Sequence, residues 1–224
     1  DYLFLTNNSS RSRREYVQKL RRLGLNLPEE KIFTSGEATA LYLKARLPNA
    51  RIYLVGTPAL EEEFRDHGFT LSADNPDFAV LGFDTTLTYA KLWKLCDLLA
   101  AGVPYIATHP DINCPTESGF MPDIGAMIEL VAASTGRRPD VVIGKPNPPI
   151  VAALAQKLGL PVEDLCMVGD RLYTDIALGK TGCATVLVLS GETRREDLAA
   201  SPFQPDVVLA NLAELHDRLA ELRP

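Results

Sequence analysis

Short apolar runs separated by amphipathic segments are the feature that most constrains the fold of this chain. Most of the gaps between these runs are long enough to hold a helix. Such alternation predicts an α/β fold with a mainly parallel sheet, because parallel strands need a crossover connection of about helical length. The predicted strands are Tyr2–Leu5, Ile52–Val55, Phe78–Phe83, Tyr105–Ala107, Val141–Gly144, Leu165–Val168, Val186–Leu189 and Val207–Leu209.

Helical patterns fill the gaps between the predicted strands. The first predicted helix, Arg13–Leu23, is preceded by Ser12 and has Glu15 as its third residue, and this spacing is the signature of a capping box. Gly24 follows, and glycine is the usual residue just past a helix end. The other predicted helices are Leu92–Ala101, Ile124–Ser134, Pro149–Leu158 and Leu212–Leu222.

The charge balance argues against nucleic acid as a general partner. The formal net charge is -6, whereas binding to a phosphate backbone needs a basic surface. One local site can still hold a small anion. No apolar run approaches the roughly 18 residues that span a membrane, so no membrane partner is expected. The four cysteines show no C-x-x-C spacing, so we expect reduced thiols in a cytoplasmic protein.

Polar residues directly follow several of the predicted strands. Thr6 and Asn7 follow the first strand, and Lys145, Asp170 and Asp175 follow two later ones. In open α/β sheets, ligands bind beyond the carboxyl ends of the strands, so these side chains are candidate site residues. A hydroxyl and backbone N–H groups can hold phosphoryl oxygens, an ammonium group can neutralise their charge, and a carboxylate can bind Mg²⁺.

Each of these residues also has a purely structural interpretation. Thr6 can simply end a strand, and Lys145 can be a solvated surface charge. Asp170 can be the N-cap of the next helix. The three residue types in this order, each at a predicted strand end, favour the interpretation as a site.

Three segments carry a resemblance to a known family. LTNNSS, GKPNP and GDRLYTDI resemble the second, third and fourth motifs of the haloacid dehalogenase-type phosphatases. The insert between the second and third motifs, with ATHPD and the P-x-x-G-A of Pro122–Ala126, resembles the class IIA cap group of NagD-like proteins and 4-nitrophenylphosphatases. The resemblance implies a Rossmann-like three-layer core with an inserted α/β cap. Residues 1–49, without the N-terminal strand of the family, and 139–224 would form the core, and residues 50–138 the cap.

The resemblance also implies roles in a Mg²⁺-dependent phosphatase of small phosphorylated metabolites. Thr6, with the backbone of Asn7, would bind phosphoryl oxygens. Lys145 would stabilise the attacking carboxylate and the transferring phosphoryl group. Asp170 would bind Mg²⁺, and Asp175 would either complete the metal site or orient the lysine.

The cap is expected to face the leaving group of the substrate. Its loop between His109 and Ile124 would lie there, and His109 and Asp123 are candidate substrate contacts. A metal cluster of His109, Asp111 and Cys114 is an alternative interpretation of the same loop. The resemblance further implies a homodimer joined through the cap.

One family element is absent from these 224 residues. The first motif, D-x-D-G-T, supplies a carboxylate nucleophile, and a covalent intermediate divides phosphoryl transfer into two easier steps. Asp84 in the segment FDTTLT imitates this motif, but Thr86 replaces the second carboxylate and the position lies within the insert. We therefore expect an aspartyl-phosphate mechanism whose nucleophile lies upstream of Asp1, so that residues 1–224 alone are inactive. The alternative is a non-catalytic family remnant or truncated product that acts as a binding or scaffold protein.

Overall fold

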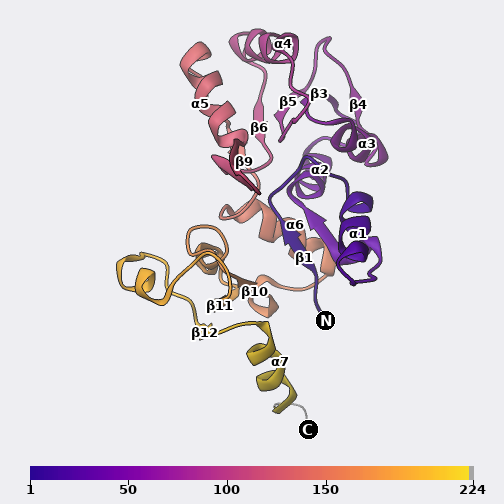
Figure 1. Ribbon diagram of the computed structural model, residues 1–224. Coiled ribbons are helices and arrows are strands. Elements are labelled where there is room, and N and C mark those ends of the chain that lie inside the picture. Colours follow the sequence, from indigo (N-terminus) through magenta and orange to yellow (C-terminus); the bar gives the residue numbers. More distant parts are fainter. Residues whose placement is uncertain (222–224) are drawn as a thin grey trace. The chain divides into compact units, whose positions relative to one another are not determined.

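The computed structural model describes residues 1–221 and divides into two compact units (Figure 1). The first unit is Asp1–Gly144, and the second begins at Lys145. Both sheets with more than two strands are parallel throughout. The predicted α/β class with mainly parallel pairing is therefore confirmed.

The first unit begins with a parallel pair of short strands. Its elements are β1 (Phe4–Thr6), α1 (Arg13–Arg22), the 3₁₀ helix η1 (Glu29–Lys31), β2 (Ile32–Thr34) and α2 (Ser35–Arg46). β1 and β2 run parallel, with Thr6 opposite Thr34. The predicted capping box of α1 is confirmed, because Ser12 Oγ accepts the Glu15 N–H at 3.3 Å and a Glu15 carboxylate oxygen accepts the Ser12 N–H at 2.9 Å.

A five-stranded parallel sheet forms the larger part of the first unit (Figure 1). In spatial order its strands are β4 (Thr70–Leu71), β3 (Arg51–Val55), β5 (Phe78–Leu81), β6 (Tyr105–Ala107) and β9 (Val141–Val142). The helices between them are α3 (Pro58–Asp66), α4 (Tyr89–Ala100) and α5 (Ile124–Thr135). Residues of the sheet, α4 and α5, including Leu81, Leu99 and Val131, bury one apolar core. This core fixes the carboxyl ends of β3, β5 and β6, where several candidate residues follow.

An antiparallel hairpin interrupts the connection from β6 to α5. Its strands are β7 (Asn113–Thr116) and β8 (Gly119–Pro122). The sequence predicts a loop here, because the segment contains no apolar run. Gly119 has a φ of 144°, a backbone conformation that residues with side chains rarely adopt, and this glycine allows the tight reversal.

The second unit contains a three-stranded parallel sheet. Its elements are α6 (Pro148–Leu158), η2 (Val162–Asp164), β10 (Cys166–Gly169), η3 (Ile176–Thr181), β11 (Ala184–Val188), η4 (Arg195–Ala200), β12 (Val207–Leu209) and α7 (Leu212–Glu221). The spatial order is β10-β11-β12. Leu187 and Val186, neighbours on β11, belong to different apolar clusters, so both faces of this sheet carry apolar side chains.

All eight predicted strands occur, with ends within two residues of the prediction. The first strand differs in burial, because Tyr2 and Phe4 are 59% and 40% exposed rather than buried. Among the described residues β1 pairs with β2 alone, which leaves it less surface to pack against. The predicted last helix residue, Leu222, lies outside the described residues. No helix in residues 1–221 combines the length and apolar content needed to cross a membrane.

Candidate active site

The loop after β1 is built around a turn formed by its own side chains. Asn8 Oδ1 accepts the N–H and the hydroxyl of Ser10 at 2.9 and 2.8 Å, and the Asn8 N–H donates to Thr6 Oγ1 at 3.2 Å. Asparagine and threonine favour such local bonds in turns. The loop continues to Ser12, the N-cap of α1. The predicted phosphate-binding residues Thr6 and Asn7 thus lie in a turn of defined shape.

Side chains that follow two other strands hold the backbone of this loop. The Ser35 hydroxyl, directly after β2, donates to the carbonyl of Asn7. The Thr57 hydroxyl, after β3, donates to the carbonyl of Ser10 at 2.8 Å. Both carbonyls are therefore satisfied from inside the protein, while the N–H groups of Asn8 and Ser10 donate within the turn itself.

A chain of buried polar groups runs from Ser9 to the N-terminus of α5. Ser9 Oγ accepts the N–H of Phe83 at 2.9 Å and lies 2.9 Å from Thr108 Oγ1. Thr108 Oγ1 lies 3.1 Å from His109 Nδ1, and His109 Nε2 lies 3.0 Å from Asp123 Oδ1. His109 is 0% and Asp123 3% exposed. The two predicted substrate contacts are thus brought together in the interior, and their contact with substrate stays a prediction.

The side chain of Asn7 faces the same segment. Its Nδ2 donates to both carboxylate oxygens of Asp111, at 3.1 and 3.2 Å. His109, Asp111 and Asp123 each place one possible ligand atom within 4.8 Å of the others, so this group could hold a metal ion. The sequence suggests a cluster of His109, Asp111 and Cys114. Within residues 1–221 the structure instead groups His109 and Asp111 with Asp123.

Tyr16 is a neighbour of the loop that sequence reasoning missed. Burial raises the pKa of Tyr16, although a hydrogen bond with the Thr6 side chain and the charge of Arg11 act in the opposite direction. The Tyr16 hydroxyl therefore lies in a shielded position, in hydrogen-bond contact with the Thr6 side chain. In the sequence, Tyr16 belongs to the apolar face of the first predicted helix. The one signal that could have placed it near the loop is its position one helical turn after the N-cap residue Ser12.

In the second unit, the structure joins Lys145 to Asp175. Lys145 Nζ lies 2.7 Å from Asp175 Oδ1, with 12% and 6% of the two side chains exposed. Asp175 Oδ2 accepts the N–H of Arg171 at 3.2 Å, so both oxygens of this carboxylate are engaged. Asp170 Oδ2 accepts the N–H of Glu192 at 2.7 Å. The protein orients Asp170 through one oxygen, and the other can serve as a ligand atom.

Two glycines allow these carboxylates to approach the backbone closely. A Cβ atom on Gly191 would lie 2.1 Å from Asp170 Oδ2, and one on Gly169 would lie 2.4 Å from the Asp175 side chain. A side chain at either position would displace a carboxylate. Gly169, the glycine of the G-D-x-x-x-x-D segment, is therefore required on steric grounds, because a side chain there would collide with Asp175.

Asp84, which imitates the family nucleophile, is engaged in a turn. Its Oδ2 lies 2.7 Å from Lys91 Nζ, and its Oδ1 accepts the N–H and the hydroxyl of Thr86 at 2.8 and 2.6 Å. Only 2% of the Asp84 side chain is exposed. Both of its oxygens therefore have partners inside the first unit.

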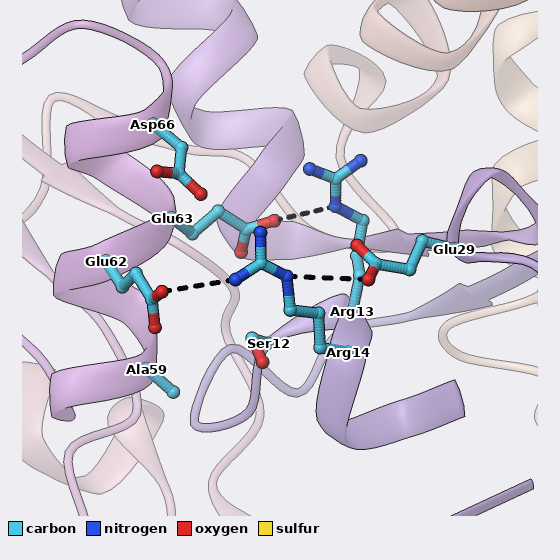
Figure 2. A pocket seen from close by; sticks show the side chains of 8 residues that line it. All are labelled: Ser12, Arg13, Arg14, Glu29, Ala59, Glu62, Glu63 and Asp66. Atoms are coloured by element: carbon cyan, nitrogen blue, oxygen red, sulfur yellow. Dashed lines mark hydrogen bonds and ion pairs between the residues drawn. The ribbon is translucent and has the colours of Figure 1, made fainter. Parts of the chain in front are cut away.

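A small cavity beside α1 and α3 is lined by opposite charges (Figure 2). Its volume is about 30 Å³, and its lining residues are Ser12, Arg13, Arg14, Glu29, Ala59, Glu62, Glu63 and Asp66. Arg13 reaches Glu63 at 3.2 Å and Glu37 at 3.4 Å. Burial raises the pKa of Glu63 to about 7, against the lowering effect of Arg13. Ligand pockets usually measure hundreds of Å³, so this cavity suits water rather than a metabolite.

Family comparisons agree with the residues described above. A family model described as haloacid dehalogenase-like hydrolase matches residues 1–70, and one described as HAD-hydrolase-like matches residues 142–215. A dihydroxyacetone phosphatase of Corynebacterium glutamicum is 35% identical, over 97% of this chain and 79% of that protein. The 5'-nucleotidase YutF of Bacillus subtilis is 36% identical, over 95% of this chain and 83% of that protein.

Solved structures of phosphatases also match this chain over most of its length. A 4-nitrophenylphosphatase from Thermotoga maritima is 50% identical, covers 95% of this chain and 82% of its own, and superposes with a TM-score of 0.91. A p-nitrophenyl phosphatase from Archaeoglobus fulgidus is 36% identical, covers 97% and 85%, and has a TM-score of 0.90.

Proposed function

Because this chain belongs to the haloacid dehalogenase-like hydrolases and is a phosphoric monoester hydrolase, we propose that it uses Mg²⁺ and an aspartyl-phosphate intermediate to dephosphorylate small metabolites. The single observation that carries this proposal is the Lys145–Asp175 ion pair in the same unit as the oriented carboxylate of Asp170. A part-buried ammonium group and a carboxylate with one available oxygen are what phosphoryl transfer needs for charge stabilisation.

The oxygen donors of the second unit fit Mg²⁺. Asp170 would hold the ion through Oδ1, because Oδ2 is occupied by the Glu192 N–H. Mg²⁺ in phosphoryl-transfer sites is usually bound by one or two carboxylates, with waters and substrate phosphate completing its shell. Asp175 would act mainly by orienting Lys145, since both of its oxygens are engaged by the chain. When bound, the metal supplies positive charge that offsets the charge of the phosphoryl group.

In the first unit, Thr6 and Asn7 would bind phosphoryl oxygens. The carbonyls of Asn7 and Ser10 accept bonds from internal hydroxyls. The loop can therefore present the Thr6 hydroxyl to an anion without exposing these two carbonyl oxygens to it, while the Asn8 and Ser10 N–H groups hold the turn in shape. Lys145 would neutralise charge on the transferring group and keep the attacking carboxylate ionised.

The nucleophile in this proposal is an aspartate in a segment upstream of Asp1. The engaged oxygens of Asp84 make it a poor substitute. We also propose residues 50–138 as a cap inserted between two core segments, 1–49 and 139–224. The consecutive strands β3 to β6 belong to one sheet, and β9, just beyond Arg138, is the edge strand of that same sheet.

Small phosphorylated metabolites are proposed as substrates because the relatives include phosphatases named for dihydroxyacetone, nucleotides and acid sugars. We further propose a cytoplasmic homodimer joined through the cap, without nucleic-acid or membrane partners.

Protein expressed from the complete gene would test the proposal with 4-nitrophenyl phosphate and Mg²⁺. We expect turnover that requires Mg²⁺ and falls at least about a hundredfold in Asp170→Asn, as expected for loss of one electrostatic stabiliser. Asp164→Asn is the matched control, because it removes an exposed carboxylate from the same unit. No turnover by the wild-type protein, or full activity of Asp170→Asn, would overturn the proposal.

A further inference from the structure

Four buried side chains connect the phosphate-binding loop, Thr6–Ser10, to the N-terminus of α5. Ser9, Thr108 and His109 are 0% exposed, and Asp123 is 3% exposed. Buried polar groups are almost always hydrogen-bonded, because an unmade bond in the interior is costly. Each link needs one donor and one acceptor, so the direction of one bond constrains the next.

The direction of this chain follows from its two ends. Ser9 Oγ accepts the Phe83 N–H, so its hydroxyl hydrogen is available for Thr108. Asp123 Oδ1 also accepts the Ile124 N–H at 2.7 Å, so it is the acceptor in its contact with His109 Nε2. In a neutral imidazole with Nε2 as the donor, Nδ1 has no hydrogen and accepts from the Thr108 hydroxyl at 3.1 Å. All four groups are then satisfied without a further charge.

We propose that His109 and Asp123 are positioning residues that set the conformation of the phosphate-binding loop through this hydrogen-bonded chain, without touching substrate. The inference rests on the proposed function, which gives the loop its role. Ser35 contacts the same imidazole without extending the hydrogen-bonded chain: its hydroxyl donates to the Asn7 carbonyl, and its oxygen packs 3.4 Å from the unprotonated His109 Nδ1. The imidazole of His109 therefore contacts both Thr108 and Ser35, the two residues that hold Ser9 and the Asn7 carbonyl of the loop.

Close packing keeps the imidazole in this place. A Cβ atom on Gly144 would lie 2.5 Å from His109 Cβ and 2.7 Å from Asn7 Oδ1, so nothing larger than glycine fits between the histidine and the loop. The proton on Nε2 also directs this nitrogen at Asp123 rather than at a metal ion shared with Asp111. The chain therefore predicts that the group of His109, Asp111 and Asp123 does not bind metal.

Nitrogen-15 NMR of the histidine side chains in the complete protein tests the proton assignment. We expect a protonated signal from Nε2 and an unprotonated signal from Nδ1 of His109, identified by their loss in His109→Gln. Addition of Zn²⁺ should leave both signals in place. A protonated Nδ1, or a Zn²⁺-induced shift of these signals, would overturn the inference even if the enzyme is active.

Kinetics of Thr108 variants test the positioning role. Thr108→Val keeps the shape but removes the hydroxyl, and should raise both KM and the inhibition constant of inorganic phosphate on the order of tenfold, as for one buried hydrogen bond. Thr108→Ser restores the hydroxyl and should recover wild-type values. Thr135→Val is the matched control, because it loses a hydroxyl that donates to Val131 within α5.

The outcomes separate this inference from the proposed function. An inactive wild-type protein would refute the proposed function itself. An active wild-type protein with unchanged KM and phosphate inhibition in Thr108→Val would refute the positioning role alone. If Thr108→Val does not fold, the NMR assignment of the His109 proton in the wild-type protein still tests the hydrogen-bonded chain.

Discussion

Replacing Glu63 by glutamine should stabilise the protein at alkaline pH and leave it unchanged at acidic pH. Glu63 is 5% exposed on α3, with Arg13 at 3.2 Å from one oxygen and the Thr34 hydroxyl at 3.4 Å from the other. Burial outweighs these partners and raises the pKa of Glu63 to about 7, and the charge of Glu37 adds to the rise. Glutamine has nearly the same shape and does not ionise, so it resembles the protonated side chain.

The size of the effect follows from proton linkage. A carboxyl whose pKa is higher in the folded than in the unfolded state stabilises the fold at low pH, and this stabilisation is lost as the pH rises through the folded pKa. For Glu63 the pKa rises from 4.5 to about 7. At about 1.4 kcal/mol per tenfold change, the wild-type protein loses about 3 kcal/mol of unfolding free energy between about pH 4.5 and pH 8.

Urea unfolding at about pH 5 and pH 8.5 measures this difference. The stability of Glu63→Gln relative to wild type should increase by about 2.5 kcal/mol between the two pH values, because part of the loss has already occurred at pH 5. Glu62→Gln is the matched control, because this exposed neighbour pairs with Arg14 at 3.3 Å and should change stability by less than about 1 kcal/mol. A relative stability of Glu63→Gln that is constant with pH would refute the reasoning.

Three further predictions concern single residues. Asp84→Asn should lower the unfolding free energy by about 1–3 kcal/mol, because Lys91 loses its carboxylate partner and keeps the neutral Gly56 carbonyl and Thr86 hydroxyl. The kcat for 4-nitrophenyl phosphate should stay near wild type, and a large fall in kcat would instead show that Asp84 takes part in the chemistry. Ser12→Ala should cost about 1 kcal/mol in urea unfolding through loss of the capping box, and an unchanged midpoint would contradict this. Gly144→Ala should cost about 1–3 kcal/mol in thermal unfolding, because its Cβ would meet the Cβ of His109 at 2.5 Å; a wild-type melting temperature would disprove the close contact.

Local patterns in the sequence predicted some elements well. The capping box at Ser12 needs only residues three apart, and the structure contains both of its bonds. The apolar runs that became strands are also local signals. For Asp175 the sequence predicts two alternative roles, completing the metal site or orienting Lys145. It does not distinguish them, because it does not show which neighbour each carboxylate oxygen contacts.

Elements without a one-sided apolar pattern escaped prediction. Seven of the twelve residues of α2 are buried, including Ser35, Glu37 and Thr39, so polar residues face the interior and no amphipathic stripe exists. Thr57 followed by Pro58 could have signalled the start of α3, since threonine caps helices and proline favours their first position. β2 has three residues and β4 has two, too few for a periodicity to emerge.

The buried chain behind the loop could not be predicted from the sequence. Ser9 and Thr108 are 99 positions apart, and neither lies in a segment whose composition indicates a partner. The sequence predicts substrate contact for His109 and Asp123, because their loop resembles a cap loop. Their burial becomes visible only when the sheet, α5 and the loop are packed together.

The long separation between Ser9 and Thr108 also affects how the protein is made. Contacts between residues distant in sequence form late, because the intervening chain must first be ordered. A nascent chain emerging from the ribosome without Thr108 contains the whole Thr6–Ser10 loop but lacks this anchor. We therefore expect the loop to reach its final shape only after β6 has been synthesised and paired.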